Sequence, residues 1–351
     1  MATLTETAYY TRRAINWTIL GILAYILLRM FWSLLVIVWM VMFPPKPIPP
    51  NHAFGTLPKV KFAAVATPSA KLTFQLETIE GGVPEASDSA VVYFMPKSAP
   101  NLLGLNKAQQ FATSLQFDPA PIAESKNVYR FNDPREPLRR LRYDIVSKNF
   151  ILRYAFEQDA SAFLNKNLPL SDAAKLEAIT LLQSYDIYPE DFEKGAPTVT
   201  FLRIVTNKLV TTTSLSQGDA VRIDFFRKPI GDTLVVTPNP DEASISIIFS
   251  GNQQIQKRIL QLAYTYWPVD YQTTATYPMK PSATAWEELQ AGEGYIARYP
   301  TNGAKSAVVR SVYLAYYDSF EPQTYLQPIF VFEGDNGFVA YVPAISPEWS
   351  E

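Results

Sequence analysis

The sequence predicts an α+β protein in which a single N-terminal transmembrane helix precedes an ectodomain of antiparallel sheets, each packed with short helices. The run from Ile15 to Phe43 is predominantly apolar, with Arg29 as its one charged residue, and a helix needs roughly 20 apolar residues to cross a bilayer. The chain beyond this run is rich in aromatic residues, with 20 Tyr and 21 Phe in the whole sequence, which favours sheet. Short stretches with helical spacing also alternate with stretches of strand-like alternation.

The flanks of the apolar run predict its orientation. Arg12 and Arg13 precede it, whereas only Lys46 follows it closely. The positive-inside rule therefore places residues 1–14 in the cytoplasm and residues 44–351 outside. The run exceeds the hydrophobic region of a cleaved signal peptide, and no small-x-small site follows it. We expect a single-pass protein of the cell membrane, held by an uncleaved signal anchor.

Arg29 stands near the middle of the predicted span. A charge at the bilayer centre costs ~2.5–3.5 kcal/mol on insertion scales. One interpretation is that Arg29 contacts a polar or acidic group on a partner membrane helix. The other is that the span lies closer to Phe43, so that Arg29 snorkels to the cytoplasmic interface.

The composition excludes several functional classes. The sequence has no cysteine and one histidine, His52, so disulfides and zinc or copper sites are not expected. A Ser/His/Asp hydrolase cannot be assembled around this lone histidine, and no glycine-rich phosphate-binding motif is present. The net charge of −2 gives no argument for nucleic acid. We expect no cofactor.

The region after the span is expected to form two α+β units joined by helices. Residues 44–58 are rich in proline and predict an extended stalk, in which His52 would be solvated. The expected ranges are a cytoplasmic tail at 1–14, a transmembrane helix at 15–43, the stalk at 44–58, a first unit at 59–156, a helical bridge at 157–195 and a second unit or units at 196–351.

Local patterns predict the elements of these units. In the first unit, strands are expected at 71–78, 90–95, 127–131, 138–146 and 150–156, with a helix at 107–115. The bridge is expected to hold helices at 158–164 and 170–185, the latter capped by Ser171. In the second unit, strands are expected at 198–205, 221–226, 234–237, 244–249, 295–297, 307–317, 327–333 and 338–342, with helices at 253–262 and 283–291. Asn336-Gly337 predicts a hairpin turn.

A weak internal repeat links the two units. In each, a helix is followed by three strands, and Glu136-Pro137 and Glu321-Pro322 occupy corresponding places. A true repeat would explain the length of the chain, although such a pattern also arises by chance.

The C-terminal stretch resembles the end of the YycH/YycI group of membrane-anchored regulators. The residues that carry this resemblance are the helix Ala285–Leu289, the strand Val312–Tyr317, the strand entry Leu326–Ile329 and the ending Phe338–Ala344. The resemblance implies a short cytoplasmic tail, one span and an ectodomain of helix-plus-sheet units similar to the PepSY type. It also implies a non-enzymatic protein that restrains a partner sensor kinase through its membrane helix.

Two kinds of side chain could mark a catalytic or binding site. Paired carboxylates hydrolyse glycosides, and the candidates here are Asp224, Glu287, Glu288, Asp318, Glu333 and Asp335. Aromatic side chains bind sugars or fill cores. Those of the C-terminal unit are Tyr264, Tyr266, Trp267, Tyr271, Trp286, Tyr295, Tyr313, Tyr316, Tyr317 and Tyr325, and a core role is favoured.

A basic cluster is the candidate for an anionic ligand. Strand alternation places Arg140 and Arg142 on one face and Arg139 on the other, and Arg130 lies on a neighbouring strand. Arg130, Arg140 and Arg142 are therefore a candidate patch for an anionic polymer or lipid headgroup. The alternative is a solvated surface whose arginines pair with nearby carboxylates.

The sequence thus predicts a non-enzymatic regulatory or scaffold protein of the cell envelope. Its predicted partners are the bilayer and another membrane protein, contacted through the span and the ectodomain, and a homo-oligomer is possible. The rival hypothesis is a cell-envelope protein that binds glycans or hydrolyses them with carboxylates.

Overall fold

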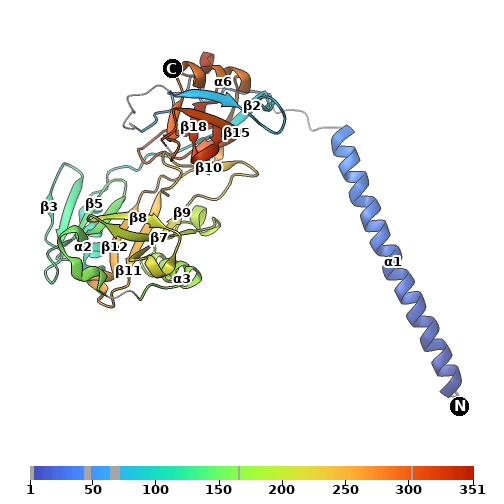
Figure 1. The fold of residues 1–351 in the computed structure, drawn as a ribbon, viewed down its shortest axis with the longest axis horizontal. Coiled ribbons are helices and arrows are strands. Elements are labelled where there is room, and N and C mark those ends of the chain that lie inside the picture. Colours follow the sequence, from blue (N-terminus) through green and yellow to red (C-terminus); the bar gives the residue numbers. More distant parts are fainter. Residues whose placement is uncertain (1–3, 43–48, 64–71, 165–166, 302) are drawn as a thin grey trace. The chain divides into compact units, whose positions relative to one another are not determined.

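The structure is a computed structural model that describes residues 4–42, 49–63, 72–164, 167–301 and 303–351. The chain divides into two compact units, residues 1–48 and 49–351. The architecture is α+β, with one long N-terminal helix followed by a sheet-rich region that contains few helices (Figure 1).

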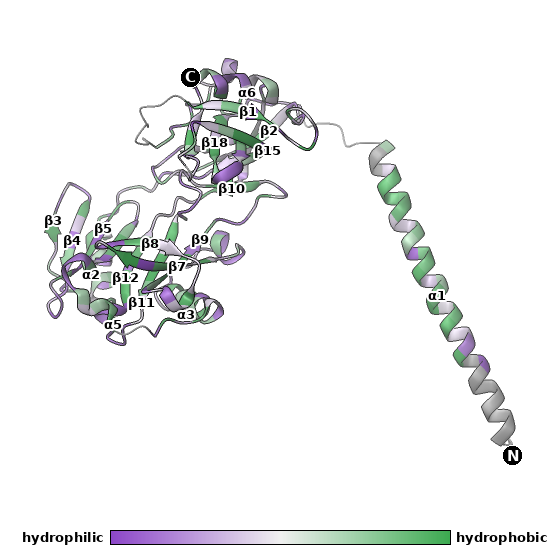
Figure 2. Ribbon diagram, viewed as in Figure 1, coloured by the Kyte–Doolittle hydropathy of each residue, from purple (hydrophilic) through white to green (hydrophobic). Residues whose placement is uncertain are grey.

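The first unit consists of helix α1 (Leu4–Met42). Its segment Ile15–Trp39 is long and apolar enough to cross a membrane, with a mean hydropathy of 2.2, and none of its most apolar part is buried inside the protein. Figure 2 shows hydrophobic residues along nearly the whole of this segment. Residues 4–14, which the sequence assigns to a tail, continue the same helix.

A nine-stranded sheet, antiparallel throughout, forms one of the two halves of the second unit. The order of its strands is β3-β4-β5-β6-β12-β11-β9-β7-β8. The strands are β3 (Ile122–Ala123), β4 (Val128–Asn132), β5 (Arg139–Asp144), β6 (Phe150–Tyr154), β7 (Thr198–Val205), β8 (Lys208–Thr212), β9 (Ala220–Phe225), β11 (Ile245–Ser250) and β12 (Ile259–Tyr264).

Two helices cover one face of this sheet, α2 (Gly104–Ser114) and α3 (Ser171–Ser184). Ala174, Ala178 and Leu182 follow one another at intervals of four residues and lie fully buried against the sheet, as expected for one face of a helix. Small alanines let the helix approach the sheet closely. We call this sheet with its helices the nine-stranded lobe.

The other half of the second unit, the six-stranded lobe, contains two sheets. The larger has the path β1-β15-β17-β18-β14, with β10 also paired to β15, and the smaller has the order β13-β2-β16. Its strands are β1 (Thr73–Leu76), β2 (Ser89–Phe94), β10 (Leu234–Val236), β13 (Asp270–Pro278), β14 (Tyr295–Arg298), β15 (Ser306–Tyr317), β16 (Tyr325–Leu326), β17 (Pro328–Gly334) and β18 (Val339–Pro343).

The six-stranded sheet is buried on both faces. Helix α6 (Ser282–Ala291) packs on one face through Ala285 and Leu289. It ends at Gly292, whose φ of 87° favours glycine. The hairpin predicted at Asn336-Gly337 joins β17 to β18, and both turn residues have positive φ, 55° and 73°. That conformation is the one that Asn-Gly favours in tight hairpins.

Sheet membership does not follow the predicted units 59–156 and 196–351. Strands β4–β6 of the predicted first unit share a sheet with β7–β9, β11 and β12 of the predicted second unit, whereas β1 joins β15. The β1 and β10 pairings with β15 are parallel, although only antiparallel pairs are predicted. Periodicity identifies strands but does not determine which distant strand each one pairs with.

Two further expectations are corrected by the structure. Of the predicted helix 253–262, only α5 (Ile255–Arg258) is helical, and Ile259 begins strand β12. Ile259 and Leu262, which have the spacing of a helical face, instead enter the core of the nine-stranded sheet. The predicted helix 158–164 is replaced by short 3-10 turns at Phe156–Gln158 and Ala160–Phe163.

The predicted stalk is also corrected where the structure describes it, at residues 49–58. This segment packs on the six-stranded lobe rather than extending as a spacer. The backbone N–H of Leu57 donates to the carbonyl of Trp349 at 2.9 Å, and Leu57 is fully buried. The ring of His52 stacks on Trp349 at 3.7 Å between centroids, so His52 is not a free solvated residue. Residues 44–48 lie outside the described residues.

Candidate functional site

Arg29 lies within the apolar segment of α1, and its side chain is exposed. Ser33, one turn further along, bonds its hydroxyl to the carbonyl of Met30 at 2.7 Å. The polar group of Ser33 is therefore satisfied within its own helix, as is common for serine in helices. Arg29 is the only charged residue between Ile15 and Trp39.

The three arginines of the predicted basic patch lie on the face of the nine-stranded sheet away from α2 and α3. On β5, Arg140 and Arg142 are exposed, whereas Arg139 is buried on the opposite face. Arg130 stands directly opposite Arg142 on β4. Arg153, which is not predicted from the sequence, stands directly opposite Arg140 on β6 and is also exposed. Its position depends on strand register, which local alternation does not reveal.

The carboxylates considered for glycoside hydrolysis are engaged with other groups. Asp224 is buried and bonds Arg222 at 2.6 Å; burial raises the pKa of Asp224 against the opposing effect of Arg222. Glu288 binds Lys280 at 2.7 Å, and Glu333 accepts a hydrogen bond from Tyr313 at 2.6 Å.

The remaining candidate carboxylates follow the same pattern, with one exception. Asp335 binds Arg310 at 2.7 Å, and Asp318 is buried in the network described next. Glu287 is exposed on α6. Five of the six candidate carboxylates are therefore held by a hydrogen bond or an ion pair.

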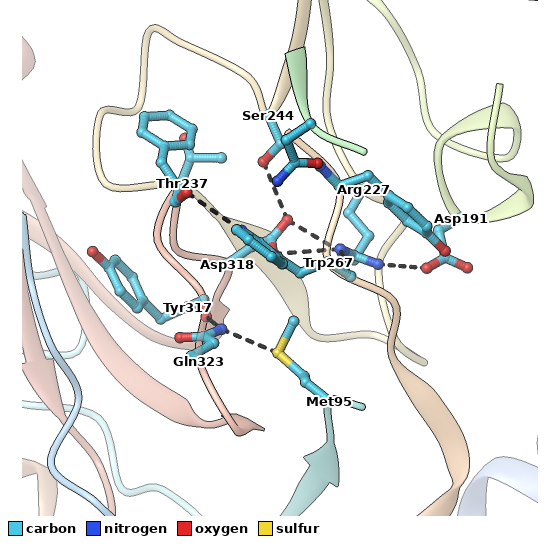
Figure 3. A network of polar contacts seen from close by, with 12 residues as sticks. Met95, Asp191, Arg227, Thr237, Ser244, Trp267, Tyr317, Asp318 and Gln323 are labelled. Carbon is cyan, nitrogen blue, oxygen red and sulfur yellow. Dashed lines mark hydrogen bonds and ion pairs between the residues drawn. The ribbon is translucent and has the colours of Figure 1, made fainter. Parts of the chain in front are cut away.

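Asp318 belongs to a buried charge network that joins the two lobes (Figure 3). Arg227 follows β9, and its Nε donates to Asp318 Oδ2 at 3.2 Å, just beyond β15. Another of its nitrogens pairs with Asp191 on the short helix α4 (Glu190–Glu193), and Nη2 donates to the carbonyl of Trp267 at 2.8 Å. The Ser244 hydroxyl completes the network by donating to Asp318 at 3.3 Å.

The charges in this network outweigh the cost of burying the guanidinium. Burial lowers the pKa of Arg227, but the carboxylates of Asp318 and Asp191 raise it by more, so the net pKa is raised. The aromatic rings of Phe192 and Tyr266 also lie 5.2 and 5.6 Å from the guanidinium carbon, within the range of cation–π attraction. The network is a structural link between the two lobes, because each of its charged groups is paired with a neighbouring residue.

The aromatic side chains of the C-terminal region mainly fill cores. Tyr316 and Tyr317 are buried in β15, and burial raises the pKa of both. Tyr295 stacks with Phe62 at 4.8 Å, and Trp286 lies 5.8 Å from Phe332. These rings pack on one another and leave little aromatic surface for a sugar.

A cavity of about 520 Å³ opens in the nine-stranded lobe. This size is typical of small-molecule sites. Its lining is largely apolar and comes from the end of α2, from β5, α3 and α5, and from strands β11 and β12. The lining residues are Leu115, Gln116, Arg139, Ala173, Leu176, Glu177, Thr180, Leu181, Ser184, Tyr185, Phe249, Ile255, Arg258 and Ile259.

The charged residues that line this cavity belong to two ion pairs. Arg258 binds Glu177 through two hydrogen bonds of 2.9 and 2.6 Å. Arg139 binds Asp133 at 2.8 Å and the carbonyl of Leu115 at 3.1 Å. The cavity therefore carries little net charge and suits a molecule that is mostly apolar.

None of the residues lining the cavity is predicted as functional from the sequence, although one signal was available. Leu176 is a large apolar residue of α3, yet it is 66% exposed. It lies two residues from Ala174 and from Ala178, so it points away from the face that they form. A large apolar residue out of phase with the buried face is such a signal.

Comparisons with known proteins do not identify a family. Neither a protein-family model nor a curated protein sequence matches the chain. Among solved structures, an uncharacterized protein from Eubacterium rectale aligns with a TM-score of 0.42 at 13% sequence identity. The alignment covers 74% of this chain and 84% of that one. What the protein does must be inferred from its own residues.

Proposed function

We propose that the protein is a single-pass, membrane-anchored interaction protein that acts through contacts of its span and its ectodomain with another membrane protein. One observation carries this proposal. The segment Ile15–Trp39 is apolar enough to span a membrane, and its side chains are exposed rather than packed in the chain's own core. An apolar helix of this length that its own protein does not cover is stable in a bilayer, where its backbone groups are all internally bonded.

The charges around the span support an orientation with the N-terminus in the cytoplasm. Arg12 and Arg13 precede the span and Lys46 follows it, and positive charge accumulates on the cytoplasmic side. Residues 49–351 would then lie outside the cytoplasm as the interacting domain.

A regulatory role is the form of this proposal that the C-terminal stretch supports. Helix α6 is followed by β15, β17 and β18, whose neighbouring strands are antiparallel. A helix and a sheet of this kind fit the resemblance to the PepSY-like units of YycH/YycI proteins. The contacts of the candidate carboxylates favour this non-enzymatic role over glycoside hydrolysis, because Asp224, Glu288 and Asp335 are ion-paired within the protein rather than left open to a substrate.

Arg29 is the residue that we assign to the membrane partner. A polar contact between membrane helices contributes about 0.6–2 kcal/mol, which corresponds to roughly threefold to thirtyfold in recovery of the complex. Removing the guanidinium should therefore weaken the association without moving the protein out of the membrane.

The experiment is cross-linking in intact membranes, followed by purification and identification of membrane proteins. Three forms of the full-length protein are compared: the wild type, Arg29→Leu, and Ser33→Leu as a matched control that removes a polar group already satisfied within the helix. We expect a membrane partner to be captured by the wild type and Ser33→Leu and lost from Arg29→Leu. Equal capture by all three forms would remove Arg29 from the proposal, and capture of no membrane protein would contradict the proposal itself.

A further inference from the structure

Four arginines form two directly opposed pairs on one face of the nine-stranded sheet. Arg130 on β4 is opposite Arg142 on β5, and Arg140 on β5 is opposite Arg153 on β6. Because opposed residues in a sheet share a face and Arg140 and Arg142 are two residues apart on one strand, all four project from the same side. We call these four residues the arginine ladder.

Like charges placed directly opposite each other destabilise a sheet. Two carboxylates offset part of this cost. Glu124 lies 2.9 Å from Arg142 and 3.9 Å from Arg130, and Glu157 pairs with Arg153. Two positive charges therefore remain uncompensated among these six residues, although the whole protein has a net charge of −2.

Arg140 is the least compensated member of the ladder. It is exposed, and among the residues that the structure describes no carboxylate forms an ion pair with it. Its sequence neighbour Arg139 shows what a structural arginine looks like in this fold. Arg139 is 4% exposed, binds Asp133 and the carbonyl of Leu115, and lies over the ring of Phe117 at 4.4 Å.

The geometry of the ladder suits phosphate groups. A carboxylate can be satisfied by the planar fork of one arginine, as Glu177 is by Arg258. A phosphate offers more acceptor oxygens and more charge, and clusters of arginine are a common means of binding it. Opposed residues on neighbouring strands are about 5 Å apart, and residues two apart along a strand are separated by about 6.8 Å. Two opposed pairs therefore present two adjacent phosphate positions.

We propose that the arginine ladder binds a linear phosphate-bearing polymer, with one phosphate between Arg140 and Arg153 and a second between Arg130 and Arg142. In the free protein, Glu157 and Glu124 occupy part of these positions and are displaced by the polymer. Asn132 and Gln261 extend the row of Arg140 and Arg153 on either side, and their amides supply further hydrogen bonds. The row of Arg130 and Arg142 is instead flanked by Ile122 and Ile151. The polymer is proposed because the two opposed arginine pairs provide discrete phosphate positions, and a lipid surface is an alternative outcome of the test.

The test measures the binding of fluorescent linear polyphosphate to the full-length protein in neutral phosphatidylcholine nanodiscs. The variants are Arg140→Gln and Arg142→Gln in the ladder and Glu157→Gln among the carboxylates. Arg203→Gln is the matched control, because Arg203 is an exposed arginine on β7 of the same sheet. Phe201, two residues before Arg203, packs on the core that α2 and α3 cover. Arg203 therefore lies on the side of the sheet opposite to the arginine ladder.

We expect each ladder variant to weaken polyphosphate binding about threefold to tenfold and to reduce the salt dependence of binding. Glu157→Gln should strengthen binding, because it removes a competing carboxylate, and Arg203→Gln should leave binding unchanged. Arg140→Gln should also leave thermal stability equal or slightly raised, since it relieves repulsion. A fall in stability would instead indicate that Arg140 serves the fold.

Two other ligands decide between the polymer and its alternatives. Polyglutamate of similar length tests whether any polyanion suffices, and vesicles containing phosphatidylglycerol test a lipid surface. Tighter binding of either one than of polyphosphate would overturn the proposal, as would polyphosphate binding that ignores the ladder variants.

Discussion

Arg227 and Asp318 join the two lobes through a buried ion pair, with Nε 3.2 Å from Oδ2 and the two side chains 1% and 2% exposed. The pair links the end of β9 in one sheet to the end of β15 in the other. A buried pair of this kind is not a large net source of stability, because both charges lose their hydration. Removal of only one of the two charged side chains, however, leaves the other charge uncompensated in the interior.

The first prediction follows from that asymmetry. Arg227→Met leaves the carboxylates of Asp318 and Asp191 buried without their cation, and it should lower the free energy of unfolding by about 3–5 kcal/mol. Urea unfolding of the full-length protein in detergent, followed by tryptophan fluorescence, measures the change. Arg310→Met is the control: Arg310 pairs with Asp335 in a largely exposed position, where ion pairs contribute little, so its loss should change the free energy of unfolding much less than Arg227→Met does. Equal effects of the two substitutions would contradict the assignment of Arg227 as a structural link between the two lobes.

The second prediction concerns pH and Asp159. Its carboxylate accepts hydrogen bonds from Lys257 at 2.7 Å, from Tyr154 and from the Ser161 hydroxyl at 2.8 Å. These bonds lower the pKa of Asp159 below its ordinary value of 3.8. A carboxyl group whose pKa is lower in the folded state stabilises the fold above the unfolded pKa, and this contribution is lost as the pH falls towards the folded pKa.

Asp159→Asn should therefore destabilise the protein at neutral pH by about 1–3 kcal/mol. It should also remove part of the decrease in stability that the wild type shows on acidification below about pH 4. Thermal unfolding between pH 7 and pH 2 measures both effects. A variant whose stability runs parallel to that of the wild type over this whole range would show that Asp159 is not responsible.

The third prediction tests the cavity of the nine-stranded lobe with a matched pair of leucines. Leu176 lines the cavity and is 66% exposed, whereas Leu170 does not line it and is 67% exposed. An apolar fluorescent probe that binds there should lose affinity in Leu176→Ala by about 1–3 kcal/mol, the range for burying such a side chain. Leu170→Ala should bind the probe like the wild type. Titration of probe fluorescence decides, and equal affinities in both variants would place the probe elsewhere.

The fourth prediction concerns the attachment of residues 49–58 to the six-stranded lobe. Leu57 is fully buried, so Leu57→Ala should cost about 2–5 kcal/mol and expose the chain near His52 to proteases. Leu102 is fully exposed, and Leu102→Ala should change neither stability nor digestion at that site. Limited proteolysis with mass determination of the fragments measures the difference. Cleavage near His52 at the wild-type rate would show that Leu57 does not hold the segment in place.

The sequence predicts the local features of this fold well because they depend on nearby residues. Arg140 and Arg142 share a face as strand alternation requires, and Asn336-Gly337 forms the expected turn. What could not be predicted depends on distant partners. Arg153 completes the arginine ladder through register with Arg140, and His52 is held by Trp349 from the far end of the chain.

The failure at 253–262 has a physical cause as well. Ile255, Ile259 and Leu262 have the spacing of a helical face, but the segment lies beside β6 and β11, where strand pairing satisfies its backbone. Tertiary pairing overrides weak local preference in such cases. The apolar cavity was missed for a related reason, because its lining is assembled from six separate elements that only the fold brings together.

The pairing of β1 with β15, and of residues near 57 with residues near 350, has a consequence for the order in which the protein is made. The six-stranded lobe contains both ends of the sheet-rich region, whereas most of the nine-stranded lobe lies between them in the chain. The nine-stranded lobe can begin to fold while synthesis continues, but the six-stranded lobe cannot complete its sheets until its last strands have been synthesised. During that interval its early strands are unpaired edges exposed to other chains. Chaperones that bind extended polypeptides would therefore be needed most by the early strands of the six-stranded lobe.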